Sequence, residues 1–112
     1  MAVVVFTSGA SALLAAIETA IQDGKVQTWR RTEDGDFTIE PPGSRLYGRA
    51  WLRPKIVDGR LLLRVVRPSG QSVPQEVYGA YQARFIELLL THFPDKFNEV
   101  RATSTPTIDD KV

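Results

Sequence analysis

Apolar positions along the chain predict a helix near the start, a run of short strands, and a longer second helix. Leu13, Ile17 and Ile21 recur at a spacing of four residues, which places them on one face of a helix. Ser8 or Ser11 is expected to cap the start of this helix. Large apolar groups on a single face imply that the helix packs against another layer of structure.

The second helix is predicted from Ser72 to about Phe93. Ser72 and Gln75 have the spacing of a capping box, and Pro74 suits the first helical turn because its missing N–H is not needed there. Apolar side chains cover most of this helix and leave only a narrow polar stripe. One sheet does not need so much apolar surface, so the excess either meets the first helix or forms a two-fold interface with a second copy.

Between and before these helices the residues favour strands joined by tight turns. Asp34-Gly35 and Asp58-Gly59 are typical hairpin turns, and Pro54 suits an irregular or edge position in a sheet. We therefore predict an α+β fold: a curved, mainly antiparallel sheet of four to five strands, with the N-terminal and C-terminal helices packed on one face. The predicted strands are Val3–Phe6, Val26–Arg31, Phe37–Glu40, Tyr47–Arg53 and Leu61–Arg67.

The length of 112 residues suits one domain, which we place at residues 1–102. Residues 103–112 contain paired aspartates and no apolar pattern, so a flexible C-terminal tail is expected there. The chain has no cysteine and no apolar run long enough to cross a membrane, and it shows no clear signal peptide. A cytoplasmic location is therefore expected, with no membrane partner.

Charge is distributed unevenly along the chain. Residues 25–67 hold ten Lys and Arg against five carboxylates, a net charge of +5, whereas the remainder holds four cations against eight carboxylates, a net charge of −4. The overall net charge of +1 thus conceals a basic segment, and this segment coincides with most of the predicted sheet. A basic surface of this kind attracts polyanions.

Alternation within the strands predicts where these cations point. Side chains two residues apart share a face of a strand, so one strand gathers Arg and aromatic groups on one side and small apolar groups on the other. Aromatic rings that stack on bases, beside guanidinium groups that hold phosphates, suit nucleic-acid binding. Cross-strand packing of Arg and Trp is the structural alternative. The candidate binding residues are Trp29, Arg31, Tyr47, Arg49, Trp51, Arg53 and Arg64.

Catalytic and metal-binding chemistry has little support in the sequence. Carboxylates gather near the first hairpin, but without the spacing of a calcium loop, and no glycine-rich phosphate loop or nucleophile elbow occurs. We expect no metal, no cofactor and no enzymatic activity. The predicted function is a small binding module whose basic, aromatic sheet face engages nucleic acid or another polyanion. The alternative is a protein-interaction or regulatory module that acts as a homodimer or binds an acidic protein.

Overall fold

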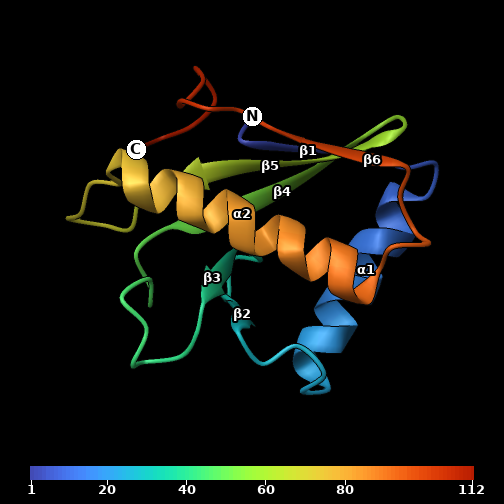
Figure 1. Ribbon diagram of the computed structural model, residues 1–112, viewed down its shortest axis with the longest axis horizontal. Helices are drawn as coiled ribbons and strands as arrows, with labels where there is room; N and C mark the ends of the chain where they lie inside the picture. Colours follow the sequence, from blue (N-terminus) through green and yellow to red (C-terminus); the bar gives the residue numbers. More distant parts are fainter.

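The fold is α+β, with two helices and one open antiparallel sheet of six strands, in a computed structural model that describes residues 1–112 (Figure 1). The predicted fold class is confirmed, and the sheet has one strand more than the upper limit that we predicted. The elements are β1 (Val3–Phe6), α1 (Ala10–Gln22), β2 (Trp29–Arg31), β3 (Phe37–Ile39), β4 (Trp51–Val57), β5 (Arg60–Val66), α2 (Gln75–His92) and β6 (Glu99–Ala102).

The strands lie in the order β2-β3-β4-β5-β1-β6, so the first strand of the chain is an interior strand of the sheet. Two hairpins, β2–β3 and β4–β5, form between neighbours in the sequence. The glycines of the predicted turns, Gly35 and Gly59, take positive φ values of 87° and 73°, which a residue with a Cβ adopts only with strain. Both predicted hairpins are therefore present.

Both helices pack on the same face of this sheet. Alternate strand residues such as Val5, Leu52 and Leu63 are fully buried, and they join Ile17 of α1 and Phe85 of α2 in one core of 24 residues. Figure 1 shows α2 crossing the sheet, with its C-terminal end beside α1. The opposite face of the sheet carries no helix.

Strand β4 differs from the predicted strand Tyr47–Arg53, because it begins at Trp51 and continues through Pro54 to Val57. Strand β3 pairs with β4 only where Phe37 faces Leu52, so the side of β4 beyond that point is open. A proline is tolerated there, because its nitrogen has no hydrogen to give to a neighbouring strand.

The late start of β4 has its cause in a turn that the Tyr81 hydroxyl holds. This buried group donates to the Leu46 carbonyl oxygen (2.5 Å) and accepts from the Arg49 and Ile39 N–H groups (3.1 and 3.3 Å). Gly48 within the turn has a φ of 61°. These bonds satisfy backbone groups that would otherwise pair in a strand.

Neither helix has the N-terminal side-chain cap that the sequence predicts. The N-cap of α1 is Gly9, and its N–H donates to the Thr7 hydroxyl (3.2 Å). The N-cap of α2 is Pro74, and the Gln75 side chain donates to the Ser104 carbonyl oxygen (2.6 Å) in place of closing a capping box. A local bond to Thr7 thus stands at the start of α1, and a tertiary contact replaces the predicted capping box of α2.

Residues 103–112, for which the sequence predicts a flexible tail, lie against the sheet and α2. Lys111 donates its N–H to the Val65 carbonyl oxygen (2.8 Å), and the Asp110 carboxylate accepts from the Val65 N–H (2.8 Å). The buried Tyr78 hydroxyl donates to Asp110 (2.8 Å) and shares a hydrogen bond with Thr103 (2.6 Å). Backbone groups and polar side chains, and not an apolar pattern, therefore make these hydrogen bonds.

Most of the apolar surface of α2 is buried within the chain itself. Tyr78, Tyr81, Phe85 and Leu89 are fully buried, whereas Leu90 is 56 % exposed. The excess surface that suggested a two-fold interface is thus largely covered by the sheet and α1. Neither helix is long and apolar enough to cross a membrane.

Replacing Tyr81 with Phe is expected to lower the free energy of unfolding by about 2 kcal/mol, because the buried Ile39 N–H loses its partner and the Leu46 carbonyl oxygen and Arg49 N–H each lose one hydrogen bond. Tyr47→Phe is the matched control, since Tyr47 is 44 % exposed, and it is expected to change the free energy by less than about 0.5 kcal/mol. Urea unfolding measures both variants. Equal effects from the two would show that the Tyr81 hydroxyl does not hold the turn.

Alkaline pH is expected to weaken the Tyr78 contacts with the tail. Burial, together with the Asp110 carboxylate, raises the pKa of Tyr78 from 10.0 to about 12. The folded state therefore holds this proton more tightly than the unfolded chain does, so the resulting stability is present below about pH 10 and is lost as the pH rises towards about 12. Urea unfolding of the wild type and of Tyr78→Phe at about pH 8 and about pH 11 measures this. A fall of equal size in both proteins would contradict the assignment.

Candidate functional site

The strongest candidate site is the sheet face that no helix covers, here called the outer face. Its side chains alternate with those of the core, and the strand register aligns them in rows across the sheet. The members are Val4, Phe6, Trp51, Arg53, Lys55, Val57, Arg60, Leu62, Arg64, Val66, Glu99 and Arg101.

Two arginines face each other directly on the outer face, since Arg53 of β4 pairs with Arg64 of β5. Like charges in this position destabilise a sheet. Asp36 offsets the repulsion by accepting from the Arg53 Nε and Nη2 atoms, both at 2.9 Å. This Asp36 side chain is only 1 % exposed, and its hydrogen bonds raise the pKa of Arg53. Arg53 therefore has a structural partner in the folded chain.

Three cations of the outer face have no carboxylate within 4.0 Å: Lys55, Arg60 and Arg64. Arg64 reaches only a backbone oxygen, that of Asp109, at 3.4 Å. Lys55 lies directly across from Leu62, which is half-buried. Leu62 thus provides an apolar position on the outer face, and the three unpaired cations lie around it.

Some side chains of the outer face already contact one another within the chain. Arg101 pairs with Glu99 at 2.7 Å, and its guanidinium carbon lies 4.8 Å from the centre of the Phe6 ring. Trp51 is half-buried and lies across from Val66. Of the aromatic rings on this face, Trp51 is therefore the one without a cation over it.

The seven predicted binding residues do not share one surface. Trp51, Arg53 and Arg64 lie on the outer face. Trp29 is 3 % exposed, because β2 aligns it with Ile39 on the core side of the sheet. Its ring meets Tyr81 and Phe85 edge-on, at 5.7 and 5.5 Å between centroids. A buried indole offers no ring to a base, so the expectation of a common surface is wrong for Trp29.

The remaining predicted residues also lie away from the outer face. The Arg31 guanidinium pairs with Glu18 of α1 at 2.9 Å, on the helix side of the sheet. Tyr47 and Arg49 belong to the turn before β4, and the Arg49 N–H is engaged by the Tyr81 hydroxyl. The turn breaks the alternation that would have placed these two side chains beside Trp51.

Sequence reasoning missed Lys55 and Arg101 as members of the outer face. Lys55 follows Arg53 at the spacing that alternation requires, but Pro54 suggested that the strand ends before it. Arg101 belongs to β6, whose four residues carry two charges and only one branched apolar side chain, so no strand signal was visible.

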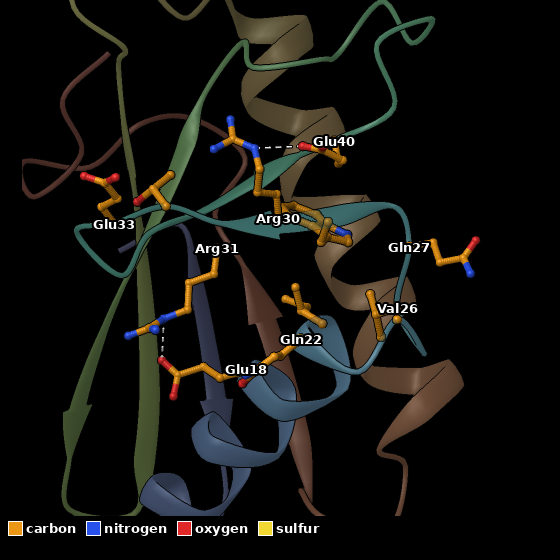
Figure 2. A pocket seen from close by; sticks show the side chains of 12 residues that line it. Glu18, Gln22, Val26, Gln27, Arg30, Arg31, Glu33 and Glu40 are labelled. Carbon is orange, nitrogen blue, oxygen red and sulfur yellow. Dashed lines mark hydrogen bonds and ion pairs between the residues drawn. The ribbon is translucent and has the colours of Figure 1, made fainter.

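A second concave region lies at the free edge of β2 (Figure 2). This cleft of about 670 Å³ is bounded by the end of α1, the loop that follows it and β2. Figure 2 shows the ion pair Arg31–Glu18 on one side of the β2 ribbon and Arg30–Glu40 on the other. Both charge signs line this cleft, as two ion pairs.

The carboxylates of the first hairpin do not converge on a metal site. Asp36 points to Arg53 and Glu40 to Arg30, the latter pair at 2.7 Å. No group of three or more His, Cys, Asp or Glu side chains in the structure is placed to hold a metal ion.

Replacing Asp36 with Asn is expected to lower the free energy of unfolding by about 2 kcal/mol, because charge-assisted hydrogen bonds are lost and Arg53 faces Arg64 without compensation. Glu99→Gln, which opens the exposed pair with Arg101, is the control and is expected to cost less than about 1 kcal/mol. Thermal or urea unfolding measures both. Similar costs for the two variants would show that the buried carboxylate has no special role in the sheet.

Comparisons with known protein families, curated proteins and solved structures give no match to this chain. What the protein binds is therefore inferred from the side chains of the outer face.

Proposed function

We propose that the protein is a small, non-enzymatic module that binds nucleic acid through the outer face. The observation that carries the proposal is the group of free cations Lys55, Arg60 and Arg64 on the sheet face that no helix covers. A fold gains little by gathering unpaired like charges, whereas a polyanion that binds there neutralises them. The expected cytoplasmic location is part of this proposal.

Contacts to phosphate groups are expected to dominate the binding. Arg64 and Lys55 border a shallow depression of about 310 Å³ on the outer face, large enough to admit a phosphate group, although Asp109 stands at its rim. Only Trp51 offers a ring for base stacking, and it is half-buried. Binding of this kind has little sequence preference and weakens steeply with salt.

An acidic protein surface is the alternative partner, because carboxylates on such a surface attract the same three cations. Nucleic acid is favoured by the presence of Trp51 on the same face, since a ring beside guanidinium groups suits an unpaired base. The homodimer alternative depended on the apolar surface of α2, of which Leu90 is the large side chain that stays exposed.

Lys55→Ala and Arg64→Ala are each expected to reduce the salt dependence of oligonucleotide binding, lowering the slope of log K against log salt by about one. Quenching of tryptophan fluorescence by single-stranded and duplex oligonucleotides measures the affinity at several salt concentrations. Because Trp29 is buried, the quenching reports on Trp51.

Arg84→Ala is the matched control, because Arg84 is an exposed cation on α2, on the helix side of the molecule. It is expected to leave the slope unchanged. No binding at low salt would reject the nucleic-acid proposal and favour an acidic protein. Equal slopes for all three variants would place the binding away from the outer face.

A further inference from the structure

Residues 103–112, here called the C-terminal strap, fill a place in the sheet that β1 leaves open. The pairing of β1 with β5 ends at Val3, so Val65, further along β5, has no partner in β1. Lys111 of the strap takes that place. It donates its N–H to the Val65 carbonyl oxygen (2.8 Å), and its own carbonyl oxygen accepts from the Arg67 N–H (2.5 Å). Figure 1 shows the strap ending beside the first turn of α2.

Asp110 anchors the strap from the helix side of the sheet. Its carboxylate accepts from the Val65 N–H (2.8 Å), the Tyr78 hydroxyl (2.8 Å) and the Thr107 N–H (2.9 Å). Because Tyr78 is fully buried in α2, this carboxylate is directed away from the outer face. All of its hydrogen bonds serve to hold the strap in place.

Asp109, its neighbour in the chain, lies at the outer face instead. It lines the depression of about 310 Å³ together with Lys55 and Arg64, and its carbonyl oxygen accepts from Arg64 Nη1 (3.4 Å). Its carboxylate is 54 % exposed and forms an ion pair with neither of these cations, its contact being the Met1 amino group at 3.8 Å. The strap thus puts a negative charge beside the place where the proposed function seats a phosphate group.

Few apolar contacts hold the strap against the rest of the molecule. Ile108 is 99 % exposed, and only Val112 packs against the core. The remaining contacts are hydrogen bonds, whose net contribution is small because water replaces them when a segment leaves. Segments held in this way open at a lower free energy than the core does. The strap is therefore able to leave while the sheet and the helices stay folded.

We infer that the strap is an autoinhibitory element of the outer face, an inference that rests on the proposed function. In the docked state it holds the Asp109 carboxylate beside Lys55 and Arg64, where this charge repels a phosphate group. In the undocked state both cations are open to the polyanion. Because docking and binding are linked, release of the strap strengthens binding, and binding favours release by the same factor.

Asp109→Asn removes the repelling charge and is expected to raise the affinity for oligothymidine about threefold or more. Glu87→Gln is the matched control, since it makes the same change in net charge on an exposed residue of α2, on the helix side of the molecule. At about 0.1 M salt, where charges more than about 10 Å apart are largely screened, the control is expected to bind as the wild type does. Quenching of tryptophan fluorescence measures all three affinities.

Tyr78→Phe tests the strap itself, because it weakens the Asp110 anchor without changing any charge. The affinity is expected to rise about twofold, as release of the strap in about half of the molecules would produce. In the Asp109→Asn background the same substitution is expected to lose most of this effect, since the strap then no longer carries the repelling charge. Urea unfolding checks that the variants are folded.

Amide hydrogen exchange of the wild type provides a measurement that needs no variant. The Lys111 and Arg67 N–H groups form their backbone hydrogen bonds only while the strap is docked. Oligothymidine is expected to speed their exchange by about the same factor of three, through release of the strap. The Leu63 N–H, in the part of β5 that pairs with β1, is the internal control and is expected to exchange at an unchanged rate.

Higher affinity for Asp109→Asn than for Glu87→Gln, an effect of Tyr78→Phe that depends on Asp109, and faster exchange at Arg67 and Lys111 would support the strap. Equal affinities of Asp109→Asn and the wild type, or unchanged exchange at these two amides with oligothymidine bound, would overturn it and leave the proposed function in place. No binding by either protein at low salt would overturn the proposed function, and the strap inference with it.

Discussion

The buried hydroxyl of Tyr81 is the contact on which much of the fold depends. A phenol placed in an apolar core must find partners, and here it finds the Leu46 carbonyl oxygen and the Arg49 N–H of the turn before β4, in addition to the turn's own backbone hydrogen bonds. Fixing this turn determines where β4 begins. Because Tyr47 and Arg49 belong to this turn, their side chains do not continue the outer-face row that begins at Trp51.

The same contact explains why the sequence predicted some elements well and others poorly. Helices and hairpins depend on local spacing and turn residues, so α1, α2 and the turns at Gly35 and Gly59 were visible in the chain. The start of β4 depends on a side chain more than thirty residues away, at Tyr81, and no local pattern reveals it. Strand β6 is similar, because its pairing with β1, and not its own residues, makes it a strand.

For the candidate site, alternation predicted the facing of residues that do form strands, but it failed for Tyr47 and Arg49, and the alignment between strands was not predicted. Trp51 and Arg53 lie on the side of β4 opposite Leu52, as alternation predicted. Arg64 lies on the same face because the β4–β5 hairpin aligns it with Arg53. Trp29 was predicted to lie on the exposed side of the sheet. Its side chain lies on the core side instead, because β2 pairs with β3 in that register and because the Phe85 ring packs against it. A tryptophan next to arginines in a sequence can be an exposed binding residue or a buried core residue, and the local sequence does not distinguish the two.

The position of β1 within the sheet constrains how the protein can form during synthesis. This strand pairs with β5 on one side and β6 on the other, so its backbone hydrogen bonds form only after residues far along the chain have been synthesised. In a growing chain the β2–β3 and β4–β5 hairpins can close early, whereas the β6 side of β1 stays unpaired until Ala102 has left the ribosome. Three consecutive valines with an open edge are prone to pair with other chains, so β5 and β6 protect the folded protein from aggregation by covering both sides of β1.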